Sequence, residues 1–165
     1  SDLRALHAWM LPAMQIAAET EANAGVSIGI PTWLYGHEPA TPFATEHAKY
    51  FENSIREEGL LTLAIYGAIY APGSSGTLQE IFEDANQNFY VPPNEGMSPM
   101  VFLDLGGYWT RRFPVVPILR ELFGERFDEV VVVAASADEA VEAIEARAAE
   151  VATWAPVAAD RKLRA

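Results

Sequence analysis

Residues 68–80 of the chain, AIYAPGSSGTLQE, have the pattern of a short buried strand, a tight turn and the start of a helix. Pro72 ends the strand because it has no backbone N–H to donate to a neighbouring strand. Small and hydroxyl-bearing residues then form the turn: Gly73, Ser74, Ser75, Gly76 and Thr77. Helix amides, which we expect at Leu78 and Gln79, add the positive end of a helix dipole. The stretch therefore predicts a site for phosphate or a similar anion.

Apolar strand-like segments alternate with helical segments on both sides of this turn. We expect strands at 26–30, 68–71, 100–105 and 129–133, and helices at 43–66, 77–90, 114–123 and 138–151. Apolar strands that alternate with helices are typical of a parallel sheet covered on both faces. The pattern predicts the α/β class, with one doubly wound domain over residues 1–152 and a tail over 153–165. The chain opens on a helix-like segment and not on Met, so we expect a first β-α unit upstream of Ser1.

The composition of the chain limits the kinds of ligand and partner that we expect. The chain has 165 residues with 23 acidic and 11 basic side chains, and its net charge of −12 argues against a nucleic-acid polymer as ligand. A small phosphorylated ligand stays possible, because one local positive pocket suffices. No apolar run approaches the roughly 20 residues of a membrane span. The chain has no cysteine and no metal-ligand spacing, so we expect a cytoplasmic protein without a bound metal.

Aromatic and polar residues follow two of the expected strands, where ligands bind in open α/β sheets. We expect His37 and Glu38 as possible pocket residues and His47 as a surface or packing residue. Four aromatic side chains either stack on a base or pack in the core: Trp33, Tyr35, Tyr108 and Trp109. Three others are candidates for a dimer face: Phe82, Phe89 and Tyr90.

The turn PGSSGTLQE, together with Ser54-Ile55-Arg56 on the preceding helix, resembles the LONELY GUY (LOG) family. Members carry PGGxGTxxE and an arginine on the preceding helix. The resemblance runs from about Met10 to Ala146 and includes the segments VSIGIP and PMVFLDLGGYW. It implies a Rossmann-like, nucleotide-binding fold in a homodimer or higher homo-oligomer. It also implies a cofactor-free phosphoribohydrolase that cleaves a nucleoside 5′-monophosphate to the base and ribose 5-phosphate.

Residue roles follow from the same resemblance. The phosphate would lie on the turn, bound by Gly73, Gly76 and Thr77 together with Ser74 and Ser75, and the catalytic pair would be Arg56 and Glu80. Ser74 stands where the family has its second glycine, and the insertion at 32–51 indicates a divergent subgroup. The molybdenum-cofactor carrier proteins are related in fold and bind without cleaving. A nucleotide or cofactor carrier is therefore the alternative function.

Structural roles compete with the catalytic ones. Thr77 and Glu80 have the spacing of a capping box, in which Thr77 is the N-cap and Glu80 the third helical residue. Arg56 follows Glu52 by four residues, so it could be a solvated helix arginine in an ion pair. The sequence leaves both alternatives open.

Overall fold

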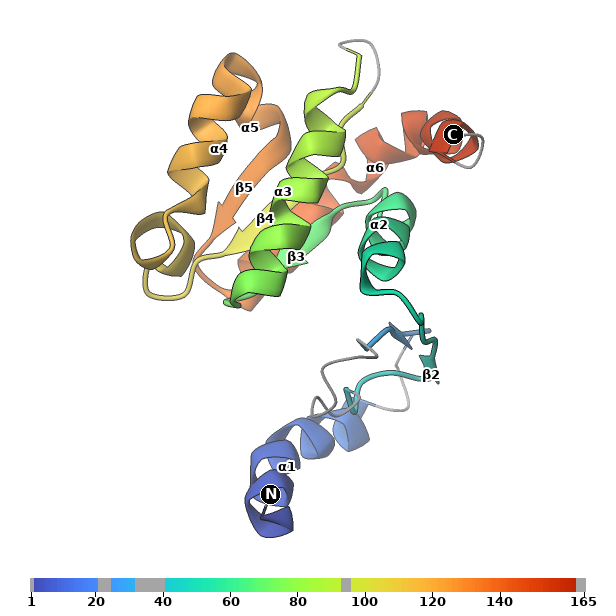
Figure 1. Ribbon diagram of the computed structural model, residues 1–165, viewed down its shortest axis with the longest axis vertical. Helices are drawn as coiled ribbons and strands as arrows, with labels where there is room; N and C mark the ends of the chain where they lie inside the picture. Colours follow the sequence, from blue (N-terminus) through green and yellow to red (C-terminus); the bar gives the residue numbers. More distant parts are fainter. Residues whose placement is uncertain (1, 21–24, 32–40, 93–95, 163–165) are drawn as a thin grey trace. The chain divides into compact units, whose positions relative to one another are not determined.

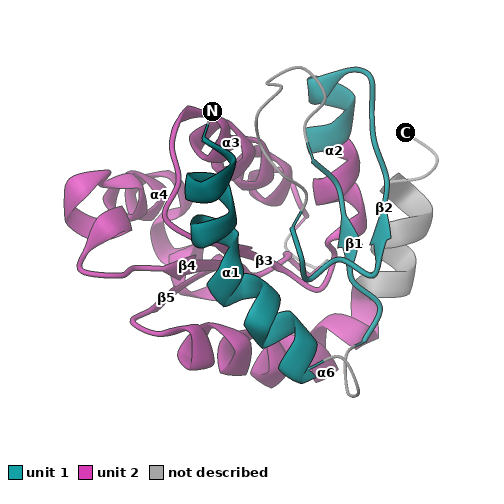
Figure 2. Cartoon of the chain, turned by 90° about the horizontal axis from the view of Figure 1, so that it is seen from below, with its two compact units in different colours: residues 1–57 teal, residues 58–165 magenta. Residues whose placement is uncertain are grey.

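The computed structural model describes residues 2–20, 25–31, 41–92 and 96–162, with side chains up to residue 154 (Figure 1). The chain divides into two compact units, Ser1–Glu57 and Glu58–Ala165 (Figure 2). The boundary between them falls inside the helix α2 (Asn53–Leu63).

The second unit is built on a parallel three-stranded sheet. Its strands are β3 (Ala68–Tyr70), β4 (Met100–Leu103) and β5 (Val131–Ala134), in the order β3-β4-β5. Tyr70 is in register with Phe102, and Phe102 with Val133. Three of the expected strands are thus confirmed. The last strand begins two residues later than we expected, because Glu129 and Val130 belong to the short helix α5 (Phe127–Val130).

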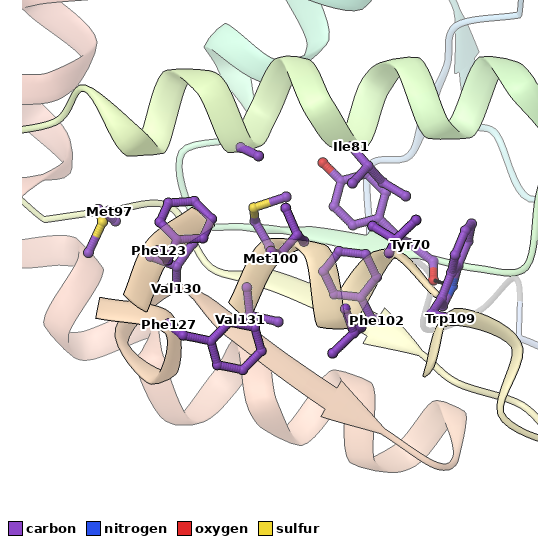
Figure 3. Close-up of a cluster of buried hydrophobic side chains, with 14 residues drawn as sticks. Tyr70, Ile81, Met97, Met100, Phe102, Trp109, Phe123, Phe127, Val130 and Val131 are labelled. Carbon is purple, nitrogen blue, oxygen red and sulfur yellow. Dashed lines mark hydrogen bonds between the residues drawn. The ribbon is translucent and has the colours of Figure 1, made fainter. Parts of the chain in front are cut away.

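Helices cover both faces of this sheet. In Figure 1, α3 (Ser75–Phe89) and α4 (Val115–Phe123) lie in front of the strands and α6 (Ala137–Lys162) lies behind them. The front face holds the larger core cluster, in which Tyr70, Phe102 and Trp109 gather at one end and Met97, Phe123 and Phe127 at the other (Figure 3). A smaller cluster lies against α6 and includes Val101, Ala134 and Ala140. Apolar residues on both faces of the strands explain their continuous hydrophobic runs.

The helix ends follow local capping chemistry. Gly124 ends α4 with a φ of 57°, a left-handed backbone that glycine adopts without strain. Ser136 caps α6, since its Oγ accepts the Glu139 N–H at 3.2 Å. The helix α6 continues to Lys162, however, whereas we expected it to end at residue 151.

The first unit differs most from the prediction. It contains α1 (Leu3–Thr20) and a two-stranded parallel sheet of β1 (Ile28–Gly29) and β2 (Glu46–His47). The predicted helix over 43–66 is therefore wrong in its first ten residues. The Thr45 and Ala48 amides donate to the carbonyls of Ser27 and Gly29 at 2.8 and 3.0 Å, so this backbone pairs with a strand instead of with itself.

The chain is thus an α/β protein with parallel sheets. Within the described residues, no helix combines the length and the apolar character needed to cross a membrane.

Candidate functional site

The stretch 68–80 folds as a strand, a turn and a helix. The strand β3 ends at Tyr70 and α3 begins at Ser75, with Ser74 as the N-cap. The helix thus begins two residues earlier than expected. The Leu78 N–H donates to the Ser74 carbonyl at 3.0 Å, so that amide belongs to the helix and is not open to a ligand. The amides without an intrahelical acceptor are those of residues 74–77, the small and hydroxyl-bearing residues of the turn.

The two glycines of the turn have different reasons to be glycine. A Cβ on Gly73 would lie 2.1 Å from Thr77 Oγ1 and 2.7 Å from Thr77 Cβ, so the backbone there is packed against the first helical turn. A Cβ on Gly76 would meet no atom within 4 Å, which leaves open space over the start of α3. Neither glycine has a positive φ. Gly73 is therefore required for close packing, and Gly76 leaves room beside the amides.

The capping-box alternative for Thr77 and Glu80 is wrong. Because Ser74 is the N-cap, Thr77 is the third residue of α3 and Glu80 is the sixth. The Ser74 side chain makes no capping hydrogen bond, so the earlier start of the helix is set by the backbone, with the Leu78 N–H bonded to the Ser74 carbonyl. Glu80 is thus one turn too deep in the helix for the capping role.

Glu80 begins a polar row along α3. Glu80, Asp84 and Asn88 are spaced by four residues, so they lie on one face of the helix. Asp84 Oδ2 accepts the Tyr70 hydroxyl at 2.7 Å, and Asp84 Oδ1 accepts Asn88 Nδ2 at 3.1 Å. Burial raises the pKa of Tyr70, and the charge and hydrogen bond of Asp84 and then the charge of Glu80 raise it further. The Glu80 carboxylate therefore lies close enough to the end of β3 for Tyr70 to respond to its charge.

The polar row on α3 also binds the segment that leads into β4. Asn88 Oδ1 accepts the Ser98 amide at 2.8 Å, Asn88 Nδ2 donates to the Ser98 carbonyl at 3.1 Å, and Ser98 Oγ donates to the Ala64 carbonyl at 3.0 Å. Asp84 and Asn88 are buried. Sequence reasoning missed both residues, although the four-residue spacing in EIFEDANQN was a visible signal.

A second loop follows β4, and hydrogen bonds to the Asp104 carboxylate hold its conformation. Asp104 accepts the amides of Trp109 at 2.5 Å and Thr110 at 3.1 Å, and the Thr110 hydroxyl at 2.6 Å. These bonds begin a π-helical turn, Tyr108–Arg112, after the left-handed Gly107. Partial burial opposes ionisation of Asp104, but these hydrogen bonds and the charge of Arg111 lower its pKa below the usual value.

The π-helical turn joins the second loop to the turn between β3 and α3, where the sequence predicts an anion site. The Tyr108 hydroxyl donates to the Gly73 carbonyl, and Trp109 Nε1 donates to the Tyr70 carbonyl at 2.9 Å. Trp109 is fully buried and meets Phe102 edge to face, so it packs in the core and does not stack on a base. The loops after β3 and β4 thus form one connected structure at the carboxyl edge of the sheet.

Two arginines of the π-helical turn bring positive charge to this edge. Arg111 Nη2 donates to the Gly106 carbonyl at 2.9 Å. The Arg112 guanidinium lies 5.4 Å from the centroid of the Tyr108 ring, in the geometry of a cation–π contact. Sequence reasoning missed both arginines, although they follow the aromatic pair Tyr108-Trp109 directly. They place cationic side chains near the turn of an otherwise acidic protein.

Arg56 is held in the first unit and is not a solvated helix arginine. Its side chain is 14 % exposed and pairs with the buried Glu57 at 3.4 Å. Its Nε donates to Asn53 Oδ1 at 3.0 Å and its Nη1 to the Ile30 carbonyl at 3.4 Å, just after β1. Arg56 and Glu80 belong to different units, so their pairing stays a prediction.

The other predicted site residues have separate outcomes. His37 and Glu38, like Trp33 and Tyr35, lie outside the described residues. His47 is exposed in β2. Within the parts of the chain that the structure describes, no three acidic, histidine or cysteine side chains gather as a metal site.

Comparison of the sequence with protein-family models gives no match, and a search of curated proteins gives no relative above the significance threshold.

Proposed function

We propose that the protein is a phosphoribohydrolase of LOG type, which hydrolyses a nucleoside 5′-monophosphate to the free base and ribose 5-phosphate. The observation that carries the proposal is the start of α3. Its open amides belong to residues 74–77, and Glu80 follows Thr77 by three residues, just under one turn, on the same helix. Anion-binding amides and a carboxylate are thereby set on one rigid element.

The proposed chemistry uses this arrangement. The 5′-phosphate binds the amides of the turn, with Arg112 as a nearby cation. As the N-glycosidic bond breaks, the ribose gains oxocarbenium character, and the Glu80 carboxylate stabilises that positive charge. The base leaves with the bonding electrons, water adds its oxygen to C1′, and a proton of that water is taken up by the base. Arg56 is the proposed partner of Glu80 in this step.

Ser74 does not weaken the proposal. Its φ of −125° lies outside the left-handed region that favours glycine, so the turn does not need a glycine at this position. The proposal also includes a Rossmann-like arrangement of the whole domain, a cytoplasmic location and a homodimer or higher homo-oligomer. The alternative remains a carrier that holds a nucleotide on the same turn without cleaving it.

Turnover of a panel of nucleoside 5′-monophosphates tests the proposal, with free base measured by chromatography and ribose 5-phosphate by a reducing-sugar assay. We expect Glu80→Gln to lower kcat by about 10²-fold to 10³-fold, because it removes the charge that stabilises the transition state. Glu121→Gln, an exposed glutamate on α4, is the matched control and should keep wild-type activity. Tight nucleotide binding without any release of base would favour the carrier. Equal activity of Glu80→Gln and wild type would refute the catalytic role.

A further inference from the structure

Two adjacent residues of the π-helical turn donate to backbone carbonyls on either side of Pro72. Trp109 Nε1 donates to the carbonyl of Tyr70, the last residue of β3, and the Tyr108 hydroxyl donates to the carbonyl of Gly73, the residue before the N-cap. Trp109 is part of the core, whereas Tyr108 is only partly buried. Tyr108 therefore contacts the part of the turn that lies next to the open amides.

The carbonyl that Tyr108 binds belongs to the same peptide group as the Ser74 N–H. A peptide group is planar and trans, so its C=O and N–H point in opposite directions. When the Tyr108 hydroxyl fixes the Gly73 carbonyl, it also fixes the direction of the Ser74 N–H, away from Tyr108. A hydrogen bond at the carbonyl also polarises the peptide and makes the N–H a stronger donor.

Tyr108 is itself held in place. Asp104 accepts three hydrogen bonds from the π-helical turn, at Trp109 and Thr110. Gly107, the residue before Tyr108, has a φ of 77°, a left-handed backbone that glycine adopts without strain. The Arg112 guanidinium lies over the Tyr108 ring. The hydroxyl is therefore held by contacts within the loop 104–112.

We propose that Tyr108 is a positioning residue for the anion-binding turn: its hydroxyl orients the Gly73–Ser74 peptide so that the Ser74 N–H donates to the phosphate of the ligand. This inference rests on the proposed function, because it assumes that a sugar phosphate binds the turn. Loss of the hydroxyl alone should weaken binding of the phosphate group while the fold stays intact.

The test is Tyr108→Phe, which keeps the ring and removes only the hydroxyl. Tyr90→Phe, an exposed tyrosine at the end of α3, is the matched control. The probe is ribose 5-phosphate, which is common to every substrate in the proposal, and affinity is measured by calorimetry. We expect Tyr108→Phe to bind ribose 5-phosphate about threefold to tenfold more weakly, as loss of one hydrogen bond predicts. The control should bind like wild type.

A spectroscopic signal separates positioning from general loss of structure. In ligand-free protein, Tyr108→Phe should shift the Ser74 amide nitrogen resonance, because its peptide carbonyl loses a hydrogen bond, while Tm changes little. In wild-type protein, ribose 5-phosphate should shift the Ser74 amide resonance. This titration tests whether the ligand binds the Ser74 N–H, even if the variant does not fold.

The outcomes are distinguishable. Equal affinity of Tyr108→Phe and wild type, or no effect of ribose 5-phosphate on the Ser74 amide while it binds elsewhere, would overturn the inference and leave the proposed function standing. If wild type binds neither ribose 5-phosphate nor any nucleoside monophosphate, the proposed function fails and the inference fails with it.

Discussion

The Tyr70 hydroxyl donates a 2.7 Å hydrogen bond to Asp84 Oδ2 in the interior of the second unit. This bond joins the last residue of β3 to the face of α3 that also carries Glu80, one turn before Asp84. Asp84 is buried and hydrogen-bonded, whereas Glu80 is only partly buried. Two carboxylates on one helix face thus differ in burial, and the buried one, Asp84, has a structural role through its hydrogen bond with Tyr70.

Removal of the Tyr70 hydroxyl should destabilise the fold. Tyr70→Phe takes a donor from a buried carboxylate, so we expect the free energy of unfolding at pH 7 to fall by about 1–3 kcal/mol. Urea denaturation measures the change. Tyr66→Phe, at an exposed position, is the control and should leave the urea midpoint unchanged. A Tyr70→Phe variant as stable as wild type would contradict a structural role for this bond.

The same residue predicts how stability changes at alkaline pH. Burial raises the pKa of Tyr70 in the folded protein, so the phenol stays neutral there, while in the unfolded chain it ionises near pH 10. The unfolded state then binds fewer protons, and stability should fall as the pH rises above about 10. In urea denaturation between pH 8 and pH 11, Tyr70→Phe should lose less stability than wild type. Parallel curves would refute this assignment.

The ionisation of Asp104 should make the stability of the protein depend on pH under acidic conditions. Its pKa is lowered in the folded protein by the hydrogen bonds from Trp109 and Thr110, so its contribution is present above the unfolded pKa of about 3.9 and is lost as the pH falls below it. Between pH 5.5 and pH 3, Tm of wild type should fall more steeply than Tm of Asp104→Asn. Asp128→Asn is the control, because Asp128 is 87 % exposed, and it should follow the wild-type curve.

Two alanine substitutions in the turn should distinguish a glycine needed for packing from a glycine that leaves room for the ligand. Gly73→Ala places a methyl group against Thr77, so we expect a loss of about 1–3 kcal/mol in stability together with weaker ligand binding. Gly76→Ala meets no protein atom and should raise stability by up to about 1 kcal/mol, since alanine favours a helix. Its methyl group should nevertheless weaken binding of ribose 5-phosphate. Thermal unfolding and calorimetry on both variants check these opposite effects, and unchanged affinity of Gly76→Ala would place the ligand elsewhere.

The charge of Arg112 should matter for phosphate binding. Arg112→Gln removes a cation near the turn, and because the side chain is exposed we expect only about a twofold to fivefold loss of affinity for ribose 5-phosphate. Binding by the variant should also depend less on salt concentration. Arg120→Gln, on α4 in a surface ion pair with Asp128, is the control and should retain wild-type affinity and salt dependence. Equal salt dependence of Arg112→Gln and wild type would exclude Arg112 from the site.

Local chemistry explains why much of the second unit was predictable. The apolar runs at 68–71 and 100–105 form strands because both faces of the sheet are covered, and Gly124 and Ser136 end and begin helices through their own backbone and side-chain preferences. The start of α3 was misplaced by two residues because Ser74 and Thr77 are both favoured N-cap residues. In the structure Ser74 is the N-cap, and the local sequence pattern does not distinguish these two residues.

The sequence by itself determined the α/β class, the strands of the three-stranded sheet and the position of the turn between β3 and α3, because all of these follow from hydrophobic periodicity and from the backbone preferences of glycine, proline and serine. Only the tertiary structure decided that β2 pairs with β1, that Tyr108 and Trp109 hold the turn across 35 and 39 residues, and that Asp84 meets Tyr70. These contacts join segments distant in the chain, and no local preference of either partner specifies them.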